Sequence, residues 1–181
     1  MTAWTNPLEK SWIVNEMADA VDLNQYHTAN QNATMHRYVR KTFETPRTGA
    51  TALADNELWF NVRPGETFNV WGNIRWNNSA ASEGLRITFS IPSGSNHNGE
   101  AWGRDLSMNL QHVQFNIVAG HFGSAVTGPG TSNMVYFVTT IASGPGLGRY
   151  VFGWAKSVDL GGGGTVSVLP GSCLLVQKMT P

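Results

Sequence analysis

Apolar and polar residues alternate along most of the chain after residue 50. Leu58, Phe60 and Val62, for example, are spaced by two. This spacing places alternate side chains on one face of a β-strand. Alternation, or a high content of β-branched and aromatic residues, predicts strands at residues 58–62, 68–76, 85–89, 111–119, 135–141, 150–155, 165–169 and 172–178.

Turn signals separate these predicted strands at intervals of about 8–12 residues. They include Pro64-Gly65, Pro92-Ser93-Gly94, Gly144-Pro145-Gly146 and a run of glycines at residues 161–164. Regularly spaced short strands are typical of a sandwich, and about eight strands is the number in a jelly roll. We therefore predict a mainly β protein that forms an antiparallel, jelly-roll-like β-sandwich.

The first 46 residues follow a different pattern. Asp19 is suited to cap a helix, and Leu23, Tyr26 and Ala33 then fall near one face at helical spacing. Pro46 begins a stretch, residues 45–50, that we interpret as a linker. We therefore expect residues 1–46 to form a docking arm with one helix, and residues 47–181 to form the sandwich.

Four apolar residues of this arm are the candidate docking residues: Trp4, Trp12, Leu23 and Tyr26. A single short helix cannot bury an apolar stripe by itself. The arm therefore needs a partner surface, which is either the sandwich or another protein.

The composition is poor in charge. Lys+Arg and Asp+Glu number 12 each, so the formal net charge is +0, and 13% of residues are charged, against about 25% in typical soluble proteins. Such a weakly repulsive surface suits a subunit that neighbours cover. The lack of basic excess argues against nucleic-acid binding.

The sequence contains no apolar run near the ~20 residues of a membrane span, and the N-terminus has no signal-peptide pattern. We therefore expect a protein made in a cytoplasm.

The single cysteine, Cys173, excludes an internal disulfide, and its apolar neighbours predict a core position.

No arrangement of residues indicates an enzyme, a cofactor site or a metal site. The five histidines show no helical i, i+4 pair and have no cysteine pair beside them, and the glutamates are scattered. We predict no catalytic residues. The best polar cluster surrounds His97 at residues 96–100, in a segment interpreted as a loop over residues 95–110. It is either a sugar- or metal-contacting loop or, as we prefer, a solvated loop tip.

The tryptophans suggest a second use for the sandwich. Trp59 and Trp71 fall out of phase with the more apolar face of their strands, and Trp102 lies in the predicted loop. With His97 they are candidate residues for a ligand platform or a subunit interface. We favour the interface, because tryptophan is enriched there.

Several short motifs, in order, resemble structural proteins of tailed-bacteriophage virions. The N-terminal resemblance covers residues 12–16 and 20–26. The resemblance of the sandwich rests on Ala52-Leu53-Ala54-Asp55-Asn56-Glu57-Leu58, Pro64-Gly65-Glu66-Thr67, Ile91-Pro92-Ser93-Gly94, Gly153-Trp154-Ala155-Lys156-Ser157 and Pro170-Gly171-Ser172-Cys173-Leu174.

This resemblance implies a jelly-roll-like domain, often trimeric, in a phage particle assembled in the bacterial host cytoplasm. Its partners would be other virion proteins and two further copies of the chain. A tail or baseplate appendage is the first expectation. The alternatives are a capsid decoration or head-fibre protein, and a module that binds a host-surface glycan.

Overall fold

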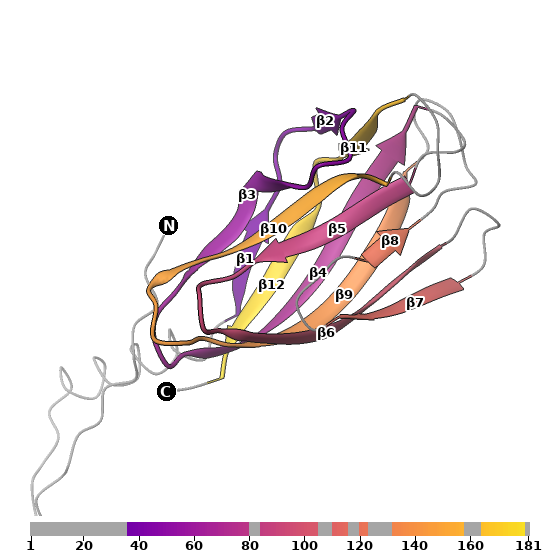
Figure 1. Cartoon of the computed structure of the whole chain (residues 1–181). Helices are drawn as coiled ribbons and strands as arrows, with labels where there is room; N and C mark the ends of the chain where they lie inside the picture. Colours follow the sequence, from indigo (N-terminus) through magenta and orange to yellow (C-terminus); the bar gives the residue numbers. More distant parts are fainter. Residues whose placement is uncertain are drawn as a thin grey trace, which may run out of the picture.

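The structure is a computed structural model that describes residues 36–79, 84–104, 110–115, 120–122, 132–157 and 164–179. In these ranges the chain forms two antiparallel β-sheets that pack face to face (Figure 1). The strands are β1 (Arg37–Arg40), β2 (Thr45–Arg47), β3 (Leu53–Val62), β4 (Thr67–Asn78), β5 (Gly84–Ser90), β6 (Asn96–Arg104), β7 (Leu110–Phe115), β8 (Gly120–Phe122), β9 (Asn133–Ala142), β10 (Gly148–Ser157), β11 (Val166–Val168) and β12 (Cys173–Lys178).

The order of the strands is that of a jelly roll. The large sheet has the order β1-β12-β4-β9-β6-β7, with β11 pairing with β4 and β2, and the small sheet has the order β3-β10-β5-β8. The chain passes from one sheet to the other at almost every connection from β3 to β12. Strands β1, β12, β4 and β9 therefore face β3, β10, β5 and β8, and this confirms the predicted antiparallel sandwich.

The core lies between the two sheets and is rich in aromatic rings. Phe89 is at its centre: its ring centroid lies 5.0 Å from that of Phe137, 5.6 Å from that of Tyr150 and 5.9 Å from that of Phe152. All four side chains are at most 9% exposed. Edge-to-face and offset pairs of this kind stabilise a core by about 0.5–1.5 kcal/mol each beyond their buried area.

One contact in this core depends on a glycine. Gly72 on β4 faces the interior, and a Cβ placed there would lie 2.0 Å from the ring of Phe137. The missing side chain lets this ring lie flat against the backbone of β4. The alternation on β4 is therefore kept, with a glycine in place of an apolar residue.

Three sequence-based expectations about the elements need correction. The predicted loop at residues 95–110 contains β6, and the predicted linker at residues 45–50 contains β2. The sandwich also begins at Arg37, inside the range expected for the arm, because β1 pairs with β12. The predicted helix lies outside the described residues, and in the described ranges no helix is long and apolar enough to cross a membrane.

Candidate functional site

The four candidate docking residues, Trp4, Trp12, Leu23 and Tyr26, lie outside the described residues. The other four candidates lie in strands, and the structure separates them into three environments. Trp71 and Trp102 lie on the outer face of the large sheet, Trp59 lies on the outer face of the small sheet, and His97 lies in the core.

Trp71 and Trp102 come together through the register of the large sheet. Trp71 on β4 lies opposite Val138 on β9, and Tyr136, two residues earlier on β9, lies opposite Trp102 on β6. At the other side of β4, Tyr38 on β1 is aligned with Trp71 through Leu175 on β12.

Four outward-pointing rings therefore cross the outer face of this sheet. We name this surface the aromatic face; its members are Tyr38, Trp71, Trp102 and Tyr136. They line one depression of about 540 Å³.

The rings of the aromatic face are open to solvent at several points. Tyr38 is 60% exposed, Tyr136 is 48% exposed and Trp71 is 36% exposed. The ring of His36, just before β1, lies 6.0 Å from that of Trp71. A contiguous exposed aromatic surface of this kind marks a binding site more often than scattered apolar residues do.

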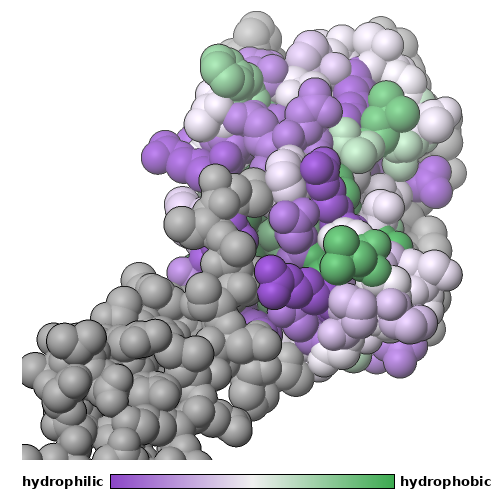
Figure 2. All heavy atoms as spheres, turned by 90° about the vertical axis from the view of Figure 1, so that its left-hand side faces the viewer, coloured by the Kyte–Doolittle hydropathy of each residue, from purple (hydrophilic) through white to green (hydrophobic). Residues whose placement is uncertain are grey.

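Trp59 has a different environment from the rings of the aromatic face. In the view from the left of Figure 1, the described surface that grey atoms leave visible is mainly hydrophilic or neutral, with separate small apolar groups (Figure 2). Trp59, on the small sheet, is also held within the chain: the guanidinium carbon of Arg149 lies 4.1 Å from its ring centroid, and its Nε1 donates to the Asn56 carbonyl at 3.0 Å. Trp59 therefore has internal partners for both its ring and its N–H.

The part of the large sheet beyond Trp102 is polar. The rings of Trp102 and His112 stack with centroids 5.5 Å apart and planes at 15°. His112 Nε2 lies 3.3 Å from a carboxylate oxygen of Glu100, and Gln114 donates to the other oxygen at 3.4 Å. The side chains of His112 and Glu100 are both more than 40% exposed, so their electrostatic attraction is weak.

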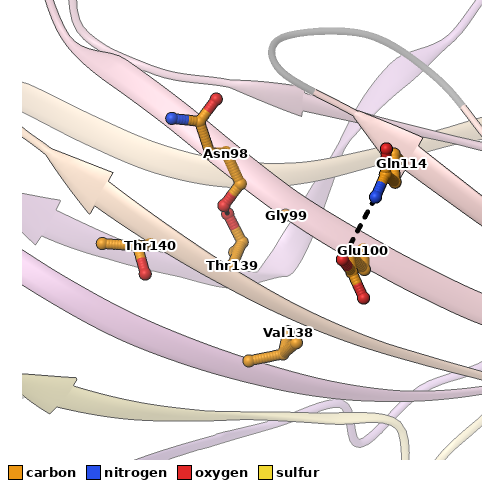
Figure 3. Close-up of a pocket in the computed structure, with 7 residues that line it drawn as sticks. All are labelled: Asn98, Gly99, Glu100, Gln114, Val138, Thr139 and Thr140. Carbon is orange, nitrogen blue, oxygen red and sulfur yellow. Dashed lines mark hydrogen bonds between the residues drawn. The ribbon is translucent and has the colours of Figure 1, made fainter.

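Glu100 and Gln114 border an open groove of about 600 Å³. Asn98 and Glu100 on β6, Gln114 on β7 and Thr140 on β9 line it (Figure 3). Val138 borders both this groove and the depression of the aromatic face. Rings and hydrogen-bonding groups therefore adjoin on one surface.

His97 is buried in the core, whereas we expected it on a solvated loop. Its side chain points inward from β6, is 1% exposed, and has its ring 4.8 Å from that of Phe89. Burial penalises the charged imidazolium and lowers the pKa of His97 to about 4. His97 is thus part of the core, and an external ligand does not reach its side chain.

One cluster of buried charges lies at a different place, where the end of β1 meets β3. Lys41 Nζ lies 2.8 Å from Asp55 Oδ2, which also accepts from Trp154 Nε1 at 3.3 Å. Asp55 Oδ1 accepts the backbone N–H groups of Glu57 and Leu58, at 2.9 and 3.1 Å. Both carboxylate oxygens thus have donors within the chain, as a structural ion pair needs.

Glu57 extends this network to the segment after β1. Its carboxylate accepts from the backbone N–H of Thr42 at 2.9 Å, from the Thr42 hydroxyl, from the backbone N–H of Phe43 at 3.2 Å and from Lys41 at 3.4 Å. Desolvation by itself raises the pKa of Glu57, but these hydrogen bonds outweigh it and lower the pKa to about 2. The network fastens the end of β1 to β3.

Among the described residues, no group of three His, Cys, Asp or Glu side chains is arranged to hold a metal ion.

The position of the cysteine differs from the expected one. Cys173 is half-buried and borders the aromatic depression, whereas we predicted a core position. It follows the turn at Pro170-Gly171 and points outward, because its neighbour Leu174 points into the core.

Sequence reasoning missed Tyr38 and Tyr136. Tyr38 falls within the range expected for the arm. Tyr136 falls in a nearly continuous apolar segment, residues 134–138, in which no polar residue reveals the outward positions. The signal that could have found Tyr136 is its phase relative to Val135 and Phe137, which are both buried.

No family model matches the chain, and no curated protein matches it. Solved structures give weak matches. One, "Structure of infectious bursal disease virus Gt strain", has a TM-score of 0.20 and 6% identity, over 80% of this chain and 37% of that chain. Another, "Crystal structure of infectious bursal disease virus VP2 subviral particle", has a TM-score of 0.18 and 5% identity, over 80% and 37% of the two chains. The chain spans less than half the length of these structures, and TM-scores this low establish no relationship.

Proposed function

We propose that this chain is a non-enzymatic structural component of a tailed-phage virion. It docks through its N-terminal arm and projects the sandwich as a trimer, as an appendage of the tail or baseplate. The aromatic face is the observation that carries the proposal, because its exposed rings have the chemistry of a contact between subunits.

The surroundings of this face support a protein contact. Tyr and Trp are enriched in interfaces and charged residues are depleted at interface centres. The centre of the face carries Val138, Leu175 and Asn73 beside the rings and has no charged side chain among its lining residues. A few such rings can supply most of the affinity of an association.

The buried charges also support a structural role. The buried cluster of Lys41 with Asp55 and Glu57 has its groups hydrogen-bonded within the chain. A catalytic cluster instead directs an acid, a base or a nucleophile to a cleft.

Mass spectrometry of purified particles tests the proposal. Particles are banded by density, dissociated, and separated into heads and tails. Peptides of this chain are expected in the tail fraction at a stoichiometry divisible by three. Peptides in the head fraction would instead place the chain as a capsid decoration or head fibre, and their absence from all particle fractions would contradict the virion role.

A second candidate function is binding of a host-surface glycan, and the groove of Figure 3 favours it. Trp102 offers an aromatic surface in the adjoining depression, while Asn98, Glu100, Gln114 and Thr140 in the groove offer donors and acceptors for sugar hydroxyls. Glycan sites combine rings with a small number of placed polar groups in this way.

An array of bacterial surface polysaccharides tests this second function. Bound glycans should lose affinity with Gln114→Ala and keep it with Asn61→Ala, because Asn61 is exposed on β3 of the other sheet. Equal loss in the two variants, or no binding on the array, would remove the glycan role.

A further inference from the structure

The rings of the aromatic face are exposed in the described part of the chain, so the face needs a partner if it is to be covered. Resting on the proposed assembly function, we propose that residues 1–35 of a second copy of this chain bind the aromatic face. The arm of one subunit would then hold the sandwich of the next. The proposal follows from charge, from apolar content and from chain length.

The charges of the two surfaces are opposite. Residues 1–35 contain one basic residue, Lys10, and four acidic residues, Glu9, Glu16, Asp19 and Asp22, so their net charge is 1 − 4 = −3. The whole chain has a net charge of +0, so the remainder carries +3. The arm and the sandwich therefore attract each other over the Debye length of about 8–10 Å.

Basic residues flank the rings. Arg40 on β1 is exposed and is aligned with Tyr136 through Cys173 and Asn73. Arg75 is exposed on β4 beyond Asn73. The acidic residue of this side, Glu100, is four strands from β1 and is paired with His112. Complementary charges of this kind orient an acidic segment along an interface.

The apolar content of the arm matches the rings. Trp4 and Trp12 are large, and Leu23 and Tyr26 share the spacing of one helical face. The depression is lined by rings and aliphatic groups, so the transfer of these side chains from water to the depression is favourable by about 25 cal/mol per Å² of buried apolar area.

The proposed trimer favours a second copy over the chain's own arm, because it places a neighbouring sandwich close by. The described chain begins at His36, at the end of β1 opposite to Arg40, which is aligned with Tyr136. A segment of 35 residues spans up to roughly 115 Å when extended, which is ample for it to reach a neighbouring sandwich.

Cys173 offers a direct report on whether the face is covered. It is the single cysteine of the chain, and it borders the depression between Arg40 and Asn73. A bound arm would shield its thiol from reagents, and an open face would leave it reactive. Chain association and coverage of the face can therefore be measured separately.

The experiment measures the reaction of Cys173 with a thiol-specific disulfide reagent, together with the solution mass, over a series of concentrations. It uses the full-length chain, the full-length Trp4→Ala/Trp12→Ala variant and the control Trp59→Ala. In the full-length chain we expect a mass of several copies and a reaction at least about tenfold slower than after dilution to single copies, a difference of about 1.4 kcal/mol. The double variant should react fast and lose mass, and the control should match the parent chain.

Other outcomes overturn the inference in distinct ways. Slow reaction at the mass of a single copy would mean that the arm covers its own sandwich. Slow reaction and unchanged mass in the double variant would mean that another surface buries the face. Fast reaction in a multimer would mean that the face stays open. In each case, the mass spectrometry of particles still decides the proposed virion function by itself.

Discussion

The charged network around Asp55 and the aromatic face differ in where their side chains find partners. Asp55 and Lys41 are both at most 2% exposed, yet each has a partner inside the chain. The rings of Tyr38 and Tyr136 remain about half exposed. The network has its partners within the chain, whereas the rings of the face are left open to solvent.

The difference separates stability from association. Loss of the buried partner Asp55 should destabilise the sandwich strongly, because the buried charge of Lys41 then lacks its partner. Loss of a ring from the face should leave the fold intact, because the ring contributes little to the core. The predictions below test this separation, from the largest expected effect on stability to the smallest.

Asp55→Ala should cause the largest loss of stability. It leaves the buried ammonium of Lys41 without its closest acceptor and removes the acceptor of two backbone N–H groups. We expect the free energy of unfolding in urea to fall by about 3–5 kcal/mol. Glu44→Ala, at an exposed position, is the control. A loss of less than about 1 kcal/mol, the range of an exposed ion pair, would show that the network does not act as a buried ion pair.

Gly72→Ala should have the next largest effect. The added methyl group would lie 2.0–2.5 Å from three ring carbons of Phe137, so the ring must move within a packed core. Overpacking of this kind costs about 1–3 kcal/mol, measurable by thermal or urea unfolding. Gly49→Ala is the matched control, since nothing lies within 4 Å of its added Cβ. Equal stability of the two variants would contradict the packing described for β4.

Acid should weaken the attachment of β1 to β3 through Glu57. The pKa of Glu57 is about 2 in the folded protein, against 4.5 for a glutamate side chain that lacks these interactions. A group with a lowered folded-state pKa stabilises the fold above its unfolded pKa, and this contribution is lost as the pH falls from about 4.5 toward 2. Unfolding measured between pH 6 and pH 2 should therefore show a steeper loss for the parent chain than for Glu57→Gln. Parallel curves would contradict the hydrogen-bonded state of this carboxylate.

Trp71→Ala should have the smallest effect on stability. The ring lies on the outer face of β4 and is 36% exposed, so we expect a change of about 0.5 kcal/mol in the unfolding of single copies. Trp76→Ala, on the inner face of the same strand and 1% exposed, should cost about 3–5 kcal/mol. Similar losses in both variants would mean that Trp71 is a core residue and not part of an open face.

Local alternation was sufficient to predict much of the sandwich. β3, β4, β5, β10 and β12 carry apolar residues at alternate positions that are all buried. β6 was not predicted, because its inward positions are His97, Gly99, Ala101 and Gly103, which do not form an apolar series. β1 was not predicted, because a strand of 4 residues is too short to show the alternation of apolar and polar residues.

The motifs that suggested a resemblance are explained by folding. Gly65 and Gly171 have φ of 75° and 87° in turns, a region that glycine adopts without strain. Glu66 accepts from the backbone N–H of Arg63 and pairs with Lys178. The Ser172 hydroxyl lies 2.8 Å from the Leu169 carbonyl. These residues close turns, so the motifs carry information on the fold and not on a ligand.

The aromatic face could be predicted only in part. Trp71 was identifiable because it is out of phase with its own strand. Its alignment with Tyr38 and Tyr136 depends on the register of β1, β12, β4 and β9, which join residues far apart in the sequence. Such non-local pairing cannot be read from the period of any one strand.

Light scattering of the full-length chain, compared with a Trp71→Ala/Tyr136→Ala variant, tests the central claim most directly. The account predicts a mass of three chains for the parent and a mass of one chain for the variant, with both equally resistant to unfolding as single copies. A parent chain of single mass, or a variant that keeps the mass of three chains, would contradict the claim that the aromatic face joins subunits.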